Sequence, residues 1–445
     1  MIVKDEAEDG HILVVGGVGS GKSSGIAIPS LLAWRERVFC IDIKGELYKQ
    51  TQRIRKNAKI FAPLDITCGY NPFYVLREAE ETAHKQNKEA NLSQEADAIS
   101  MALIPLPPKV SDPFWVESAR CMLTGMILYF YKLGFSFIKT MQTVLSIPVD
   151  KLILSIYNTT TIQTENEEVK PLPKELTSNE AVYYSNMFVG MADKTLSSIY
   201  AEMSRHIRVF ATDINIVECL SQPRNNITPH DLELGNDIFI SVPEHLLRQW
   251  KNLITLIVSQ FLRHFEKRPD MHASRKTQPI LFLLDEFPRI GKIDGITDAL
   301  ATLRSKRITI CVIIQSLAQL DLIYGKEARQ VIADTCQYKA ILSAYDVDSQ
   351  EYFSRLVGTH EVEKQSTNTQ TGRANILPTG HGTTISMEEK RKVKPEDFAT
   401  LGDIVLLRPR PYGYSKVEKI QWHENGGFMG ESGVNRIDRD ILRKK

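Results

Sequence analysis

The sequence predicts an α/β fold with a mainly parallel β-sheet and an inserted all-alpha domain, and three observations support this prediction. Short apolar runs with the length of buried strands alternate with segments of helical spacing, which is typical of a parallel sheet covered on both faces. Several of these runs end in polar residues or glycine, where a loop should begin. From about residue 137 to residue 220 no convincing strand occurs, so we expect only helices there.

Length and composition are those of a large globular protein. The chain has 445 residues, of which 42% are hydrophobic and 24% charged, which is enough for two or three domains. We expect residues 1–136 to form the first part of the α/β domain, residues 137–220 the insertion, and residues 221–445 the second part. The net charge of +1 excludes no class of partner, because a ring-shaped assembly can concentrate positive charge in a channel.

The first part of the chain predicts strands that alternate with helices. The expected elements are a strand at 12–15, a helix at 24–34, strands at 37–42 and 59–62, and helical segments over 79–131. Prolines interrupt the last of these, and Ser111 to Pro113 is placed to cap the helix that carries Trp115.

The pattern of strands resumes after the helical insertion. Inside the insertion we expect a polar loop at 158–177 and a helix at 193–209. Residues 363–387 are rich in Thr, Asn, Gln and Gly, so we expect a mobile loop there. The other expected elements are strands at 237–242, 280–284, 308–314 and 338–344, a helix at 246–265 with a core-facing stripe, and a terminal hairpin of 404–408 with 416–422.

A glycine-rich segment, here called the P-loop, follows the first expected strand where a helix should begin. It reads Gly16-Gly17-Val18-Gly19-Ser20-Gly21-Lys22-Ser23. Glycines let backbone N–H groups approach a polyphosphate, Lys22 can reach its β and γ phosphates, and the Ser23 hydroxyl suits Mg²⁺. The segment therefore predicts ATP and Mg²⁺ as cofactors, and the alternative is a glycine-rich turn with an incidental lysine. The predicted nucleotide-binding residues are Gly16, Gly17, Gly19, Ser20, Gly21, Lys22, Ser23 and Ser24.

Two carboxylates, Asp285 and Glu286, end the apolar run at 280–284. We expect them at the same sheet edge as the P-loop, because ligands of open α/β sheets bind at the carboxyl ends of the strands. In P-loop enzymes that hydrolyse nucleotides, the first residue of such a pair holds Mg²⁺ and the second orients or deprotonates water. Ser23 and Asp285 are thus the predicted metal residues and Glu286 a predicted catalytic residue of an ATPase. The alternative is an acidic helix cap.

Two other strands also end in polar residues. Gln315 follows the run at 308–314, where it could contact the γ-phosphate and sense its loss, or could merely cap a turn. Asp42 and Lys44 follow the run at 37–42. For this pair a salt bridge that fixes the loop and a direct contact with ligand are both open.

Arg304 and Arg307 precede the strand at 308–314. In a ring, one of them could reach a neighbour's γ-phosphate and stabilise the charge of the transition state. We favour Arg304 for this role, and the alternative is a solvated basic face.

Cysteine usage and hydropathy exclude two classes of protein. The six cysteines form no CxxC pair and several lie in apolar runs, so we expect core residues of a reduced, cytosolic protein. The best candidate for a membrane span, Cys121 to Tyr131, is too short, and no signal peptide is present. The P-loop lies close to Met1. Two alternatives follow: an anchor or domain that preceded it was removed, or no such segment existed.

Taken in order, several blocks of sequence resemble the coupling-protein ATPases of type IV secretion and conjugation, the TraG/TraD-like family. The resemblance runs from about residue 10 to residue 420. The blocks are the P-loop, Ile41 to Glu46, Tyr70 to Phe73, Asp112 to Trp115, Leu284 to Phe287, Ala299 to Arg304, Gln315 to Leu320 and Tyr338 to Leu342. Many ATPases share the P-loop and the acidic pair, whereas the other blocks in this order are more specific.

The resemblance implies a RecA-like nucleotide-binding domain that assembles into a homo-hexameric ring and delivers cargo to a secretion channel by hydrolysing ATP. It implies single-stranded DNA with its relaxase, or protein effectors, as cargo read by the helical domain. By position, Gln315 would be the sensor and Arg304 the finger that acts on a neighbour. Family members usually carry an N-terminal membrane anchor, which places them at the inner face of the cell membrane. A piece without the anchor is expected to be cytoplasmic and could be a monomer.

Two other functions stay open at this stage. A related ring motor would pump double-stranded DNA, although the C-terminal winged-helix module that would favour it is not evident in the sequence. A nucleotide-gated adaptor would dock substrates through its helical domain with little hydrolysis. Loss of Glu286 separates the last two classes, because an adaptor should keep transfer activity and a motor should lose it.

Overall fold

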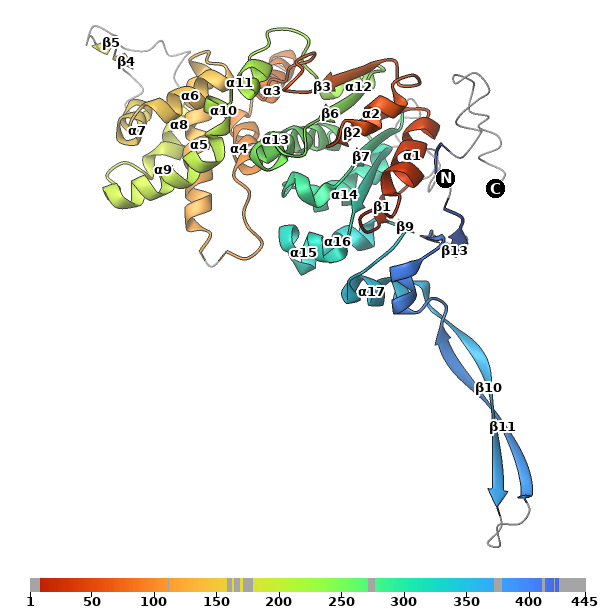
Figure 1. The fold of residues 1–445 in the computed structure, drawn as a ribbon. Helices are drawn as coiled ribbons and strands as arrows, with labels where there is room; N and C mark the ends of the chain where they lie inside the picture. Colours follow the sequence, from red (N-terminus) through yellow and green to blue (C-terminus); the bar gives the residue numbers. More distant parts are fainter. Residues whose placement is uncertain are drawn as a thin grey trace.

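A nine-stranded sheet with helices on both faces forms the centre of the molecule (Figure 1). The structure is a computed structural model that describes residues 9–110, 112–157, 162–163, 169–170, 179–270, 277–371, 378–409, 413–419 and 421–423. In spatial order the strands are β13, β12, β9, β1, β8, β7, β2, β6 and β3. Their bounds are β1 Ile12–Val15, β2 Arg37–Asp42, β3 Ala58–Phe61, β6 Asp237–Ser241, β7 Ile280–Leu284, β8 Ile308–Ile314, β9 Tyr338–Ile341, β12 Ile404–Leu407 and β13 Tyr414–Val417.

The sheet is parallel from β9 to β3 and antiparallel at the other edge. All neighbouring pairs among β9, β1, β8, β7, β2, β6 and β3 are parallel. Strand β12 runs antiparallel to β9 and forms a hairpin with β13. The predicted α/β class with a mainly parallel sheet is therefore confirmed. A terminal hairpin is present, but its second strand is Tyr414–Val417 and not the predicted 416–422.

Side chains alternate along each strand between two hydrophobic cores. Leu13 and Phe39 belong to the larger core, where the sheet meets the long helix α13 (Leu247–Glu266). Val14 and Cys40 belong to the smaller core, which α1 and α2 complete on the opposite face. Because both faces are buried, the strands read as continuous apolar runs rather than alternating ones.

The helical part lies at one end of the sheet (Figure 1). Its helix α5 packs against α8 and α9, so a helix that precedes the predicted boundary at residue 137 joins this part. The domain boundaries themselves stay a prediction. The bounds are α3 Tyr74–Lys85, α4 Leu92–Leu103, α5 Phe114–Lys132, α6 Phe137–Ser146, α7 Val149–Tyr157, α8 Asn179–Asn186, α9 Asp193–Ile207, α10 Val209–Thr212 and α11 Ile214–Leu220.

The insertion is not strictly all-alpha. Two short strands, β4 (Ile162–Gln163) and β5 (Val169–Lys170), form an antiparallel pair within it. A two-residue ladder gives no periodic signal, which is why sequence reading missed it. Most of the predicted polar loop at 158–177 lies outside the described residues.

The remaining helices connect the strands of the sheet. Before α5, the Asp112 carboxylate accepts the backbone N–H of Phe114 at 3.0 Å, as the capping prediction requires, whereas Ser111 lies outside the described residues. The bounds are η1 Lys22–Ala27, α1 Ile28–Ala33, α2 Glu46–Thr51, α12 Pro229–Glu233, η3 Phe287–Ile290, α14 Ile296–Thr302, η4 Leu303–Lys306, α15 Leu317–Tyr324, α16 Lys326–Thr335, α17 Val347–Val357 and η5 Pro395–Thr400.

The prediction of a mobile loop at 363–387 is wrong for residues 363–371 and 378–387, which the structure describes as strands. Strands β10 (Thr359–Thr371) and β11 (Pro378–Arg391) form an antiparallel hairpin that extends away from the body (Figure 1). An ion pair of 3.3 Å joins Lys364 to Glu388 across the two strands. A ribbon that covers no core needs no apolar alternation, so its polar composition resembled that of a loop.

Most of the cysteines lie in the core, as their positions in apolar runs predict. All six cysteines are free, five of them are buried, and Cys121 is half-buried. Among the described residues, no helix is both long enough and apolar enough to cross a membrane.

Candidate functional site

Four neighbouring strands end at one edge of the sheet and bring most of the predicted site residues together. The strands are β1, β8, β7 and β2, in that spatial order. Val15 at the end of β1 pairs with Ile314 at the end of β8, and Leu284 at the end of β7 pairs with Ile41 of β2. The P-loop, Gln315 and the acidic pair Asp285–Glu286 therefore leave the sheet side by side.

The P-loop turns from β1 into the helix η1, which is a π-helix. Gly19 and Gly21 have φ angles of 73° and 89°, a left-handed region that other residues rarely enter. Gly21 is the residue before η1, and its carbonyl accepts the N–H of Gly25 at 2.7 Å. Short π-helical turns occur frequently at functional sites.

Lys22 is buried and points back at its own loop. Its Nζ donates to the carbonyl oxygens of Gly16 at 2.7 Å and Gly17 at 3.0 Å. Burial lowers the pKa of Lys22, while the nearby charges of Glu286 and Asp285 act in the opposite direction. The ammonium group thus lies between the loop and the acidic pair.

The turn after β9 contacts the P-loop from its other side. The Ser343 hydroxyl accepts the N–H of Gly17 at 2.9 Å, and a Cβ on Gly17 would overlap the ring of Tyr345. A side chain at position 17 would therefore displace the exposed ring of Tyr345. Sequence reading missed both contacts, although the end of the strand expected at 338–344 marked the place.

The C-terminal segment also reaches the P-loop helix. Trp422, beyond β13, donates its N–H to the carbonyl of Ser24 at 3.1 Å. Ser24 thus contacts another part of the chain through its backbone, while its neighbour Ser23 is half-buried. Predicted nucleotide-binding residues therefore lie on a segment that two later parts of the chain contact, at Ser343 and at Trp422.

The acidic pair is buried at the end of β7. Burial, together with the charges of Glu286 and Asp42, raises the pKa of Asp285 to about 6. Glu286 has a φ of 50°, an uncommon backbone conformation for a residue other than glycine, asparagine or aspartate. Strain of this kind concentrates at functional sites.

Gln315 holds the Glu286 carboxylate. Its Nε2 lies 3.1 Å from Oε2 and 3.4 Å from Oε1 of Glu286. Gln319, one helical turn later, accepts the backbone N–H of Gln315 at 3.3 Å and donates to its side-chain oxygen at 3.4 Å. Gln319 is thus a positioning residue for Gln315, and its spacing of four residues was the available signal.

Asp42 caps a helix rather than pairing with Lys44. Its Oδ2 accepts the N–H of Tyr48 at 2.9 Å, at the start of α2, and no ion pair with the exposed Lys44 exists within the described part of the chain. Of the two alternatives that the sequence left open for this pair, the salt bridge is therefore wrong. Burial raises the pKa of Asp42, and its Oδ1 is buried without a hydrogen-bond partner among the described residues.

Arg304 and Arg307 lie at the opposite edge of the sheet, before the start of β8. Strand β8 spans seven residues, so about 20 Å separate its two ends. Arg304 is exposed and has no ion pair among the described residues. Arg307 donates to the carbonyl of Thr277 at 3.0 Å and thereby supports the local turn. Neither arginine belongs to the P-loop site of its own chain.

The oxygen groups at this edge suit a magnesium ion. Mg²⁺ prefers carboxylate, hydroxyl and water oxygens, and keeps several waters. Asp285 and Asp42 offer carboxylates, and the free Oδ1 of Asp42 has no other described partner. The Ser23 hydroxyl lies on the adjoining P-loop.

The chain is similar in sequence to proteins of conjugative transfer. Protein VirD4 from Agrobacterium fabrum (strain C58 / ATCC 33970) is 25% identical over an alignment 468 residues long, gaps included, which covers 98% of this chain and 65% of that protein. Conjugal transfer protein TraG from Escherichia coli is 23% identical over 416 residues, covering 87% of this chain and 61% of TraG. The chain thus spans less than two thirds of the length of these relatives.

Solved structures establish the fold. The unbound bacterial conjugative coupling protein TrwBdeltaN70 has a TM-score of 0.62 and 20% identity over 92% of this chain and 84% of that chain. The plasmid coupling protein TrwB in complex with ADP and Mg²⁺ has a TM-score of 0.62 and 19% identity over 92% of this chain and 85% of that chain. The shared architecture is a RecA-like α/β P-loop fold with a helical insertion.

A family model described as "Type IV secretory system Conjugative DNA transfer" matches residues 3–437. This match extends over both parts of the α/β sheet and the helical insertion between them. The chain therefore belongs to the family of type IV secretory system proteins of conjugative DNA transfer.

Proposed function

We propose that this chain is a coupling ATPase that binds ATP with Mg²⁺, hydrolyses it to ADP and phosphate, and delivers cargo to a type IV secretion channel. One observation carries the proposal: Lys22, Asp285, Glu286 and Gln315 meet at a single sheet edge beside the P-loop. The structures of TrwB with ADP and Mg²⁺ and with an ATP analogue support the same ligands.

In this proposal, Lys22 is the residue that moves when nucleotide binds. Its Nζ leaves the carbonyls of Gly16 and Gly17 and turns to the β and γ phosphates, while the P-loop N–H groups surround them. Ser23 and Asp285 would hold Mg²⁺, which supplies charge neutralisation at the phosphates. Gly19 and Gly21 give the loop the left-handed turns that this wrapping needs.

Glu286 is the proposed base or water-orienting residue. Gln315 holds the carboxylate of Glu286 in one orientation, and Gln319 in turn holds Gln315. Gln315 therefore links the position of the base to the γ-phosphate that it would contact. Loss of that phosphate would shift the Gln315 side chain and, through its hydrogen bonds to Gln319, would change the position of helix α15.

We infer that the site is completed in a homo-hexameric ring. Arg304 is exposed and lies at the sheet edge opposite its own P-loop, so it cannot reach that loop. This position suits a residue that acts on the nucleotide of a neighbouring copy. Without a membrane anchor, the chain would be a monomer with an incomplete site at low concentration and would form the ring only as its concentration rises. At the inner face of the cell membrane, the anchor would hold the ring together.

The cargo in this proposal is single-stranded DNA with its relaxase, or protein effectors, which the helical part would dock. Apolar side chains are exposed on its neighbouring helices α7 and α8, where they cover no core. They are Leu154, Tyr157 and Tyr183, with Met187 just after α8. Exposed apolar groups that gather in one place are typical of surfaces that bind other proteins.

The experiment that tests the proposal measures ATP hydrolysis by the purified chain against protein concentration, with and without single-stranded DNA. We expect a specific rate that rises with concentration and falls by about 10²- to 10⁴-fold in Glu286→Gln, which should still bind ATP. Lys22→Ala should lose ATP binding as well. A flat, negligible rate with intact ATP binding would support the nucleotide-gated adaptor instead.

A further inference from the structure

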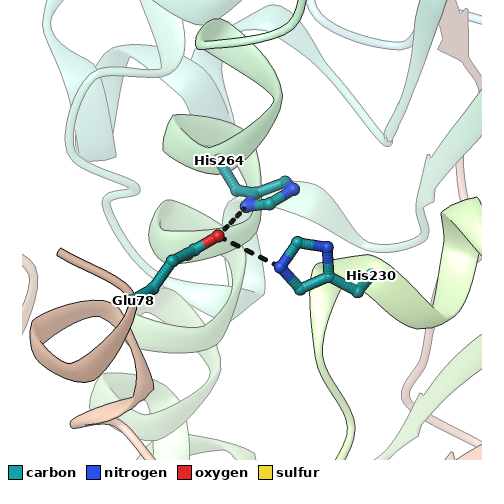
Figure 2. Close-up of side chains that lie close together, drawn as sticks. All are labelled: Glu78, His230 and His264. Carbon is teal, nitrogen blue, oxygen red and sulfur yellow. Dashed lines mark hydrogen bonds and ion pairs between the residues drawn. The ribbon is translucent and has the colours of Figure 1, made fainter. Parts of the chain in front are cut away.

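Two histidines and a glutamate far apart in the sequence converge on one point, away from the P-loop. Figure 2 shows Glu78 of α3 facing His264 of α13 and His230 of α12. The Glu78 Oε1 lies 3.0 Å from Nε2 of His230 and 3.7 Å from Nδ1 of His264. One ligand atom from each residue lies within 4.8 Å of the others.

A second carboxylate, Glu233, lies behind both imidazoles. Its Oε2 is 3.5 Å from Nδ1 of His230 and 4.0 Å from Nε2 of His264, the two ring nitrogens that do not face Glu78. Arg268 approaches the other oxygen of Glu233 at 3.7 Å. Each histidine therefore presents one nitrogen to Glu78 and the other to an anchored carboxylate.

This arrangement matches what a transition metal requires. A tetrahedral Zn²⁺ with bonds of about 2.0–2.1 Å has ligand atoms about 3.3 Å apart. The Glu78 oxygen lies 3.0 and 3.7 Å from the two imidazole nitrogens, on either side of that value, and all three ligand atoms lie within 4.8 Å of one another. Histidines that bind metals usually donate their other N–H to a carboxylate, which fixes the tautomer. Glu233 is in place to accept both N–H groups.

The charge and the exposure of the cluster also suit a cation. Two carboxylates, Glu78 and Glu233, lie against the imidazole of His230 from opposite sides. The His230 side chain is 51% exposed, which gives an ion a route from solvent.

The cluster lies at the amino-terminal edge of the sheet, opposite the P-loop. Glu233 ends α12 four residues before β6 begins, and His264 is in the last turn of α13, which leads toward β7. Glu78 comes from the first part of the chain, 152 residues before His230. A metal here would join α3 to α12 and α13 and close a long loop, which favours the folded state.

We propose that Glu78, His230 and His264 bind one divalent transition-metal ion of the Zn²⁺ type, with a water molecule as fourth ligand and Glu233 as the residue that orients both imidazoles. The ion is structural and clamps the first part of the chain to the second. It is separate from the Mg²⁺ of the nucleotide site and independent of nucleotide.

The test uses the full chain, stripped with a chelator, desalted, and dialysed against Zn²⁺ in the presence of excess Mg²⁺ and without nucleotide. Bound zinc is counted by mass spectrometry of the metal, and the melting temperature is measured in parallel. The wild type should retain one zinc per chain and melt at a higher temperature with zinc than without. Glu233→Gln should keep the site but bind zinc about 10- to 100-fold more weakly.

His230→Ala is the decisive variant, because this side chain is half exposed and its loss should not unfold the protein. His84→Ala is the matched control, since His84 is an exposed histidine on the same helix as Glu78. His230→Ala should lose the bound zinc and the shift in melting temperature, and His84→Ala should retain both. The proposal is overturned if the wild type retains no zinc, or if His230→Ala retains as much as the wild type. The cluster would then be an ion-pair network only.

Discussion

Asp285 is the residue at which the stability of the fold and the chemistry of the site conflict most directly. Burial raises its pKa from 3.8 to about 6, so the folded protein favours the neutral acid. The ionised form, which the Mg²⁺ role requires, is thus costly at pH 7.5 in the absence of the metal. Stability that is present below about pH 3.8 is lost as the pH rises through about 6.

We predict that Asp285→Asn stabilises the fold at pH 7.5 by roughly 3 kcal/mol while it abolishes Mg²⁺-dependent hydrolysis. The reason is that asparagine carries no charge to bury. Urea denaturation at pH 7.5 and at pH 4 measures the difference, which should shrink at the lower pH. Equal effects at both pH values would show that charge burial is not the cause.

Some residues of the site could be predicted from sequence and others could not. Lys22, Asp285 and Gln315 each directly follow or lie beside the end of an apolar run, which marks the edge of a parallel sheet. Asp42 had the same signal, but whether its oxygens face Tyr48 or a ligand depends on the turn after β2. Contacts between residues 152 positions apart, such as Glu78 with His230, leave no local pattern at all.

At the scale of elements, the β10–β11 hairpin is attached to the body at its base only. Arg391 bonds to Glu351 of α17 at 2.8 Å, and Lys392 donates its N–H to the carbonyl of Gly358 at 3.1 Å. Beyond this base, no described helix covers the ribbon (Figure 1). The hairpin should therefore contribute little to the stability of the sheet.

We predict that replacement of residues 361–389 by an Asn-Gly turn changes the melting temperature by only about 2–4 °C, since no residue of this range whose burial the structure describes is buried. Binding of ATP should be unchanged, because the hairpin does not touch the P-loop. Differential scanning calorimetry and ATP titration measure both. As a contrast, Phe398→Ala should cost about 3–5 kcal/mol, because that ring is fully buried. A large loss of stability in the hairpin variant would mean that the arm folds back on the body.

Strands of the central sheet were predictable because a strand that is buried on both faces needs apolar side chains at every position, as at Ile280–Leu284. The hairpin lacks that signal, since a polar strand and a polar loop have similar compositions. The π-helical turn at Lys22–Ala27 was equally hidden, because it differs from an α-helix by one hydrogen-bond register.

At the scale of the whole molecule, the proposed active site combines residues from two neighbouring copies, because the P-loop and Arg304 lie at opposite edges of the sheet. In the proposed ring, one copy would supply the P-loop with Lys22, and the next would supply Arg304 from the opposite edge of its own sheet. The sequence could suggest this only through the family resemblance, because nothing in one chain states how a second chain lies beside it.

We predict that Lys22→Ala loses ATP binding and hydrolysis. Arg304→Ala should still bind ATP but hydrolyse it about 10³-fold more slowly. Mixed in equal amounts, the two variants should regain part of the activity, since some interfaces then combine a normal P-loop with a normal arginine. Phosphate release by the mixture, compared with each variant alone, measures this. Arg307→Ala is the matched control and should keep most of the activity. No recovery on mixing would argue against a shared site.

The free edges of the β10–β11 ribbon have a consequence for solubility. Each strand pairs with its partner on one side only, so its other row of backbone groups is open to pairing with another extended chain. Exposed charges near the base, Glu361, Glu363 and Lys364 on one strand and Glu388 to Lys390 on the other, oppose such pairing. Because salt screens these charges, the purified protein should aggregate along this arm more readily at high ionic strength than at low.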